Sequence, residues 1–383
     1  MENWLSQRYR MDANKQGVDP EVVEHAVATA ENIRSINPNV PLLFSLKHLA
    51  LRAGVPYEFL RAVVERQERH FYRTFRIRKR PLEGRIRFRL IAAPVPPLMS
   101  VQRWIATQIL SEGHPHEASV AYARHSSPLK AASFHCNARW LIKIDVMNFF
   151  ESITEVAAYR AFRRFGYQPL LSFEMGRLCT RVRSWRRQAP PYWQSKSWRW
   201  GKIDSYKFST KGALPQGAPT SPMLANLTAL ELDALVTRLA NKHGLVYTRY
   251  ADDLCFSTPG EFSRAQCSQL VGEVYKALRR FGLRPQTMKT VIAPPGARKV
   301  VLGLLVDGQK PRLPREFKAR LRQHLHFLTH PSVGPALHAA RRGFASIIGL
   351  RHHVSGLIEY AASVEPAYGA RCRSQFANVQ WPF

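Results

Sequence analysis

Two short segments that join an apolar run to carboxylates constrain this chain more than any other feature. In the first, LIKIDVMNFF, Asp145 stands near the end of a strand that we expect over 140–146. The second is YADD, which carries Asp252 and Asp253 between the apolar runs GLVYTRY and LCFS. This pattern predicts a β-hairpin with the aspartates at its tip. An Asp-Asp pair alone is more often a turn or a helix cap, so its meaning depends on the rest of the chain.

Carboxylates on neighbouring strands repel one another unless a cation lies between them. Hard oxygen ligands with open coordination positions are what Mg²⁺ takes together with substrate phosphates. Two such ions, about 3.5 to 4 Å apart, stabilise both the attacking and the leaving oxygen of an in-line displacement. The chemistry that these aspartates predict is nucleotidyl transfer.

A third motif, LPQGAPTSP over 214–222, lies between the two carboxylate segments and precedes the helical pattern MLANLTALELDALVTRLA. Gly217 allows backbone to approach a nucleotide closely, and Gln216 offers an amide to a base or sugar. The prolines fix the entry to the helix. The motif predicts a nucleotide-positioning loop.

Charge indicates the kind of partner. The 383 residues include 57 Lys and Arg against 27 Asp and Glu, a net charge of +30, which requires a polyanion such as nucleic acid or an anionic membrane. No apolar run approaches the roughly 18 residues of a membrane span. The first residues mix acid and base with no apolar stretch behind them, so we expect a cytoplasmic protein without a secretory signal. Five cysteines without a CxxC pair support neither a disulfide framework nor a zinc ribbon.

A strongly basic hairpin is predicted over 71–91, where apolar and basic residues alternate with period two around a turn at 81–84. Its basic residues are Arg73, Arg76, Arg78, Lys79, Arg80, Arg85, Arg87 and Arg89, and Glu83 is its only acid. So much charge of one sign favours a phosphate-bearing partner. The alternative is a solvated edge hairpin.

Three other regions have a clear character. Residues 17–67 read as helices with breaks at 37–39 and 54–56, and the helix pair within FSLKHLALRAGVPYEFLRAVVER is more often structural than DNA-reading. Residues 181–211 combine nine Lys and Arg with four tryptophans, a composition that stacks bases, although a disordered insertion is the alternative. Beyond Pro314 the chain is helical and basic, which predicts a separate C-terminal lobe.

The order of these motifs resembles that of a reverse transcriptase: IDVMNFF, LPQGAPTSP, YADD, then Lys289 in MKT, and VLGLLV as the primer-grip hairpin. The resemblance covers roughly residues 40–365. It implies an α+β right-hand polymerase with fingers, a palm with an antiparallel sheet, and a helical thumb. We expect an N-terminal helical region over 1–70, fingers and palm over 71–305, and a thumb or C-terminal lobe over 306–383.

The resemblance also implies a set of site residues. Two Mg²⁺ ions, with Mn²⁺ as a substitute, would bind at Asp145, Val146, Asp252 and Asp253. The incoming nucleotide would meet Lys79, Arg80, Arg89, Phe150, Gln216, Gly217 and Lys289, with Phe150 excluding a ribose 2′-hydroxyl unless it only packs in the core. Nucleic acid would meet Arg76, Arg78, Arg85, Arg87, Arg186, Arg187, Trp198, Trp200, Arg315, Lys318, Arg320 and Arg322.

Within this family the bacterial retron group and the related defence-associated enzymes are most similar. Their N-A-x-x-H and V-T-G elements correspond to 131–135 and 301–303, with Ala for Asn and Leu for Thr. The resemblance implies an RNA-directed DNA polymerase that copies a structured non-coding RNA from dNTPs in antiphage defence. Its partners would be the RNA template and primer, the DNA product and RNA–DNA hybrid, and an effector protein. The alternative is an RNA-binding scaffold for an effector, with a vestigial polymerase site.

Overall fold

The computed structural model describes residues 4–66, 70–82, 85–123, 126–182 and 212–383, without the side chains of 79–82, 85 and 87. The chain folds as two compact units. Unit 1 comprises Met1–Tyr122, Val146–Leu235 and Leu278–Arg284, and unit 2 comprises Ala123–Asp145, Val236–Ala277 and Pro285–Phe383. Helices and an antiparallel sheet both contribute, so the fold class is α+β, as predicted. No helix in these ranges has both the length and the apolar composition needed to cross a membrane.

Unit 2 is built on a sheet with the strand order β6–β7–β3–β8, in which β9 also pairs with β3. The strands of this sheet are β3 (Trp140–Met147), β6 (Val246–Tyr250), β7 (Asp253–Thr258), β8 (Arg284–Pro285) and β9 (Val291–Ala293). The last two residues of β3 and the first residue of β8 belong to unit 1. β3 is antiparallel to both β7 and β9, and Leu141, Ile142 and Ile144 are buried along it. The hairpin predicted at YADD is formed by β6 and β7.

Helix α6 (Pro128–Ser133) is fixed to this sheet by a histidine that follows it. The buried His135 ring bonds through Nδ1 to Ser257 Oγ on β7 and through Nε2 to Thr248 Oγ1 on β6, both at 2.7 Å. Burial lowers the pKa of His135 to about 4, so the ring is neutral at neutral pH. His135 is the histidine of the segment 131–135, and its hydroxyl partners give it a structural role.

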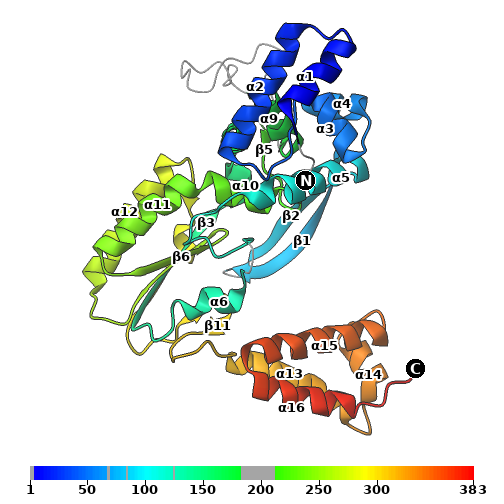
Figure 1. Ribbon diagram of the computed structural model, residues 1–383. Helices are drawn as coiled ribbons and strands as arrows, with labels where there is room; N and C mark the ends of the chain where they lie inside the picture. The colour runs from blue at the N-terminus through cyan, green and yellow to red at the C-terminus, as the bar shows by residue number, and fades with distance from the viewer. Residues whose placement is uncertain (1–3, 67–69, 83–84, 124–125, 183–211) are drawn as a thin grey trace. The chain divides into compact units, whose positions relative to one another are not determined.

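The remainder of unit 2 is mainly helical. It contains α12 (Arg264–Arg280, whose last turn belongs to unit 1), the short 3₁₀ helix η4 (Thr287–Lys289), the small hairpin β10 (Val300–Val301) and β11 (Leu304–Leu305), and then α13 (Arg315–Thr329), α14 (Gly334–Arg341), α15 (Ile347–Val364) and α16 (Pro366–Ala377). The last four helices form the C-terminal group (Figure 1), which begins after Pro314 as predicted. Apolar stripes bury Leu321 and Leu325 of α13 against Leu350 and Val354 of α15 in one cluster.

Unit 1 begins with four helices, α1 (Ser6–Lys15), α2 (Pro20–Ile36), α3 (Leu46–Ala53) and α4 (Tyr57–Glu65). Local chemistry sets their ends. The Asp19 side chain caps α2 by accepting from Glu21 N, and Gly54 ends α3 with a φ of 64°. Helix α1 lies within the predicted N-terminal helical region but before the pattern at 17–67, because it is polar along its length and, of its residues, only Ala13 is buried.

The predicted basic hairpin is a long antiparallel ribbon of β1 (Tyr72–Leu82) and β2 (Arg85–Pro94) (Figure 1). Opposite residues of such a pair share a face. One face carries Phe75 opposite Ile91 and Ile77 opposite Arg89, and the other carries Arg78 opposite Phe88. The described side chains at the outer part of the ribbon are exposed on both faces, which is consistent with a surface that receives a partner.

The remaining elements of unit 1 are α5 (Pro96–Gln108), η1 (Leu110–Glu112), α7 (Phe149–Ser152), α8 (Glu155–Arg163), α9 (Pro169–Leu178), β4 (Arg181–Val182), β5 (Gly212–Ala213), α10 (Ser221–Thr228) and α11 (Leu230–Lys242), whose C-terminal half belongs to unit 2. A buried ion pair ties several of them together. Arg66 Nη2 lies 2.9 Å from Glu155 Oε2, and the two side chains are 7% and 0% exposed. The same carboxylate oxygen accepts from Gly212 N at 2.9 Å, and Arg66 Nη1 donates to Thr180 O at 2.6 Å.

Breaking this pair on one side should destabilise the protein strongly, because the Arg66 charge would stay buried without its counter-ion. We expect Glu155→Gln to lower the free energy of unfolding by about 3 to 5 kcal/mol. The matched control is Glu231→Gln, which removes an exposed ion pair to Arg164 Nη2 of the same 2.9 Å length and should cost about 1 kcal/mol or less. Urea unfolding of both variants is the measurement, and equal losses would contradict the role given to Glu155.

Candidate active site

The strand register places the predicted carboxylates together at the end of the unit 2 sheet. β3 and β7 pair so that Asp145 lies directly opposite Asp253, and β6 and β7 pair so that Tyr250 lies opposite Asp253. Only Ala251 and Asp252 remain between the two strands of the hairpin. Residues far apart in the sequence therefore meet at one end of the sheet, as the motifs predict.

The turn that carries Asp252 has an unusual backbone. Ala251 adopts a left-handed φ of 55°, a conformation that a non-glycine residue adopts only at a cost. The buried Arg249 donates from Nη1 to the Ala251 carbonyl oxygen at 3.2 Å. This guanidinium supports the conformation that presents the two aspartates.

The electrostatics of this end of the sheet are unfavourable for closely spaced negative charge. Burial and the neighbouring carboxylates Asp253 and Asp145 raise the pKa of Asp252. Burial and Asp145 also raise the pKa of Asp253, and the positive charges of Lys143 and Lys289 oppose this. A cation placed among these oxygens would remove the repulsion.

One cation is already present in the protein itself. Lys289, at the end of η4, donates from Nζ to Asp145 Oδ2 at 2.7 Å. The sequence pointed to Lys289 as a nucleotide contact but did not predict this partner.

The donor set fits divalent metal ions in its chemistry. The aspartates supply hard oxygens, and Asp145 and Asp253 are cross-strand neighbours. The buried Val146, on the same strand as Asp145, offers a main-chain oxygen as a further ligand. As the side chains stand, no three His, Cys, Asp or Glu among the described residues converge to hold a metal, and Asp145 bonds Lys289 instead.

In unit 1, three of the predicted nucleotide-positioning residues line one pocket. Phe150, Gln216 and Gly217 line a cavity of about 430 Å³. Met99, Arg103 and Tyr122 line it too, and sequence reasoning missed them because they belong to no motif. The Tyr122 and Phe150 rings lie 6.4 Å apart, centroid to centroid. The cavity offers two aromatic rings, an amide and an exposed guanidinium, groups that suit a nucleotide.

Gly217 belongs to a loop that passes very close to β2. Ala92 N donates to Gln216 O at 2.8 Å, and Gly217 has a φ of 116°. A Cβ on Gly217 would lie 2.8 Å from Ile91 Cγ2 and 3.2 Å from Ala92 O. Both the conformation and the space therefore require glycine.

The ribbon presents its arginines in two directions. Arg89 lies on the face of Ile91, which packs toward Gly217, so it has the orientation expected of a nucleotide contact. Arg76 and Arg78 lie on the opposite face. Lys79, Arg80, Arg85 and Arg87 belong to the paired strands, but their side chains lie outside the described part of the chain.

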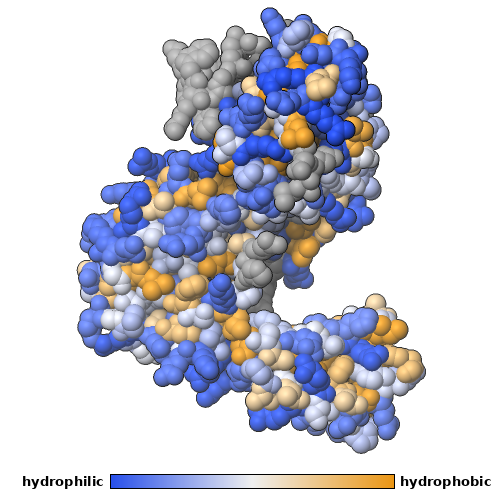
Figure 2. All heavy atoms as spheres, viewed as in Figure 1, coloured by the Kyte–Doolittle hydropathy of each residue, from blue (hydrophilic) through white to orange (hydrophobic). Residues whose placement is uncertain are grey.

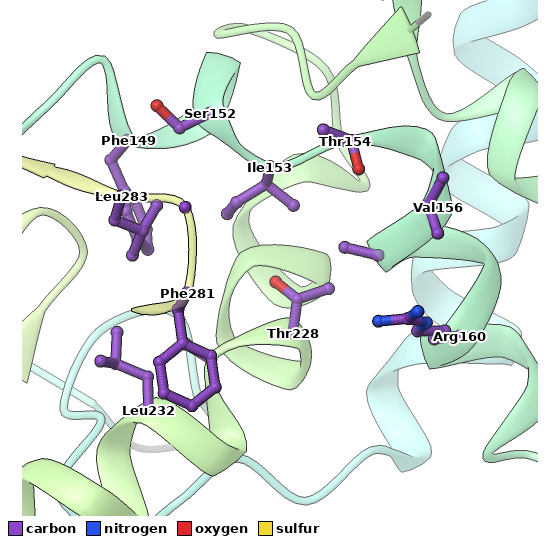
Figure 3. Close-up of a pocket in the computed structure, with 13 residues that line it drawn as sticks. Phe149, Ser152, Ile153, Thr154, Val156, Arg160, Thr228, Leu232, Phe281 and Leu283 are labelled. Carbon is purple, nitrogen blue, oxygen red and sulfur yellow. The ribbon is translucent and has the colours of Figure 1, made fainter. Parts of the chain in front are cut away.

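Phe149, the neighbour of Phe150, faces a different pocket (Figure 3). It is 3% exposed and lines an apolar cavity of about 390 Å³ together with Leu232, Phe281 and Leu283. Ser152, Thr154, Thr228 and Arg160 supply its polar groups. The adjacent rings thus line separate cavities, Phe149 this one and Phe150 the one with Gln216.

The predicted nucleic-acid contacts of the C-terminal helices lie on α13. Arg315, Arg320 and Arg322 are exposed, whereas Lys318 is half-buried and pairs through Nζ with Glu365 Oε2 at 2.5 Å. Arg186, Arg187, Trp198 and Trp200 lie outside the described residues.

Hydrophilic side chains cover most of the face seen in Figure 2.

Carboxylates paired across neighbouring strands are the donor set that nucleotidyl transfer with divalent ions requires. Residues 77–313 match the family described as reverse transcriptase (RNA-dependent DNA polymerase). The chain therefore belongs to the reverse transcriptase family, is of the retron type, and is an RNA-directed DNA polymerase with an α+β polymerase fold.

Curated relatives agree with this assignment. The chain is 27% identical over 336 residues to the retron Ec86 reverse transcriptase of Escherichia coli, covering 87% of this chain and 93% of that protein. It is 32% identical over 250 residues to the retron Mx162 enzyme of Myxococcus xanthus, covering 62% and 49% of the two chains. It is 26% identical over 310 residues to the Escherichia coli retron Ec83 enzyme, covering 80% and 87%.

Gly217→Ala tests the nucleotide pocket. We expect a severalfold higher KM for the nucleotide in primer extension, because a Cβ would push the loop away from β2 and displace Gln216. Gly272→Ala is the control, because nothing lies within 4 Å of its Cβ position in helix α12, and it should stabilise the protein by about 0.5 to 1 kcal/mol. An unchanged KM in Gly217→Ala would mean that the loop does not position the nucleotide.

Proposed function

We propose that this enzyme copies a dedicated, structured non-coding RNA into DNA by a two-metal mechanism with Mg²⁺, in bacterial antiphage defence. The RNA supplies template and primer, dNTPs are the second substrate, and an RNA–DNA hybrid is the product. The enzyme would act in the cytoplasm, where dNTPs and newly made RNA are available, and an effector protein would be a further partner. Mn²⁺ would substitute for Mg²⁺.

The observation that carries the proposal is the register that sets Asp145 opposite Asp253 with Asp252 at the adjoining turn. Asp145, Asp252, Asp253 and the Val146 carbonyl would hold the ions. When bound, two such ions would stabilise the negative charge that the attacking 3′ oxygen and the leaving pyrophosphate carry in the transition state. The retron reverse transcriptases among the relatives support copying of RNA into DNA.

The other site residues bind and orient the nucleotide. Phe150 follows Asp145 closely in the chain and would lie under the sugar, where its ring leaves no room for a 2′-hydroxyl. Gln216 would bond the base or sugar, and Gly217 lets the loop lie close to it. Arg89, Arg103 and Lys289 would neutralise the triphosphate, with Lys79 and Arg80 as further candidates.

Nucleic acid would lie along the basic surfaces outside the pocket. These are Arg76, Arg78, Arg85 and Arg87 of the ribbon, Arg186, Arg187, Trp198 and Trp200 of the tryptophan-rich segment, and Arg315, Lys318, Arg320 and Arg322 of α13. We propose that residues 1–70 form an N-terminal helical region, residues 71–305 the fingers and palm, and residues 306–383 the thumb. Arginine contacts to phosphate would make RNA affinity strongly dependent on salt.

Removing one metal ligand should abolish synthesis without affecting RNA binding. Asp145→Asn and Asp252→Asn are each expected to lower the rate of Mg²⁺-dependent primer extension by several orders of magnitude. Their RNA affinity should stay near that of the wild type, because these carboxylates would bind metal and not the duplex. Near-normal synthesis by either variant would overturn the assignment, and a wild type that binds RNA but never extends a primer would favour the RNA-scaffold alternative.

The adjacent phenylalanines allow a matched test of sugar selection. We expect Phe150→Ala to raise ribonucleotide relative to deoxynucleotide incorporation by on the order of tenfold or more. Phe149→Leu, which changes a buried ring in the neighbouring cavity, should lower stability by about 1 kcal/mol and leave the sugar preference unchanged. If the preference moves in Phe149→Leu but not in Phe150→Ala, Phe150 is only a packing residue.

A further inference from the structure

Asp145 is held twice by the segment that follows β8. Gln286 N donates to the Asp145 carbonyl oxygen at 2.7 Å, and Lys289 Nζ donates to its carboxylate at 2.7 Å. Between these two contacts lies η4, in which Lys289 N bonds Gln286 O. The backbone contact fixes η4 beside Asp145, so Lys289 reaches the carboxylate from an anchored base.

The ion pair of Lys289 with Asp145 is partly buried, so its strength lies between that of a fully buried pair and that of a fully exposed pair. The side chains of Lys289 and Asp145 are 30% and 14% exposed. The ammonium therefore retains contact with water and can leave at moderate cost, whereas the carboxylate is largely shielded and needs a positive partner. Lys289 is that partner, and it comes from the same chain.

A second lysine provides a comparison. Lys143 lies two residues before Asp145 on β3, and its charge lowers the pKa of Asp253. Lys143 thus acts on the same group of carboxylates, but the pair at 2.7 Å is made by Lys289.

We propose that Lys289 is a built-in counter-cation, a positioning residue that occupies the metal-binding oxygen of Asp145 until a divalent ion displaces it. This inference depends on the proposed metal site. The displaced ammonium, still anchored through η4, becomes available to the triphosphate that arrives with the second ion. Lys289 would thus pair first with the Asp145 carboxylate and then with the triphosphate. Binding of the metal ion would release Lys289 from the first partner.

Binding of Mn²⁺ to the full-length protein without nucleic acid or nucleotide tests this exchange, with free Mn²⁺ measured by electron paramagnetic resonance. In the wild type, the ion must break the Lys289 pair before it reaches Asp145. Lys289→Gln has no pair to break, so its Kd for Mn²⁺ should be roughly two- to fivefold lower. Lys143→Gln also removes a positive charge but no bond to Asp145, and it should lower the Kd by a clearly smaller factor.

The outcomes separate this inference from the proposed function. If Lys289→Gln leaves the Kd unchanged, or lowers it no more than Lys143→Gln does, Lys289 is not a competing cation. If the wild type binds no Mn²⁺, or if Asp252→Asn binds it as tightly as the wild type, the proposed metal site itself fails. Lys289→Arg retains the charge and the hydrogen bond and should bind Mn²⁺ like the wild type.

Thermal unfolding gives a second readout. In EDTA, Lys289→Gln leaves the Asp145 carboxylate without its cation, so its Tm should fall below that of the wild type. Saturating Mg²⁺ should close most of this gap, because the ion then supplies the missing charge. A gap that Mg²⁺ does not reduce would mean that Lys289 only stabilises the fold, and the inference would be overturned.

Discussion

The antiparallel pairing of β3 with β7 is the constraint on which the site depends. Side chains alternate between the two faces of a strand, so a slip of one residue would send Asp253 to the face opposite Asp145. Buried residues on β3, such as Ile142 and Ile144, make such a slip costly. The sheet thus holds like charges together against their repulsion, and apolar packing supplies the free energy that keeps them there.

Around this sheet the molecule satisfies charge with partners from its own chain. Arg66 and Glu155 neutralise each other deep in unit 1, where an unpaired charge would be costly. At the end of β3 the situation differs. Lys289 pairs with Asp145, but burial and the neighbouring carboxylates still raise the pKa of Asp252. A structural ion pair is complete in itself, whereas this cluster of aspartates is complete only with added positive charge.

Much of the site could be predicted because its parts are short and local. The YADD hairpin, the strand that ends near Asp145 and the loop with Gly217 each follow from a few neighbouring residues. The partners that could not be predicted come from distant segments: Arg103 and Tyr122 beside Phe150, and Lys289 on Asp145. The bounds of helix α1, within the predicted N-terminal helical region, could not be predicted for a different reason, since it lacks the apolar stripe that reveals a helix in a sequence.

The hydrogen bond from Ala92 to Gln216 has a mechanical consequence for the basic ribbon. It attaches β2 near the base of the ribbon, and the strands continue well beyond this attachment toward Leu82 and Arg85. The ribbon is therefore anchored near its base, and the exposed Arg76 and Arg78 lie on the part that extends beyond this attachment. A ribbon that is anchored only near its base transmits little of any strain in its outer part to the anchored end. The loop with Gly217 is therefore held in place independently of the charged outer part of the same hairpin.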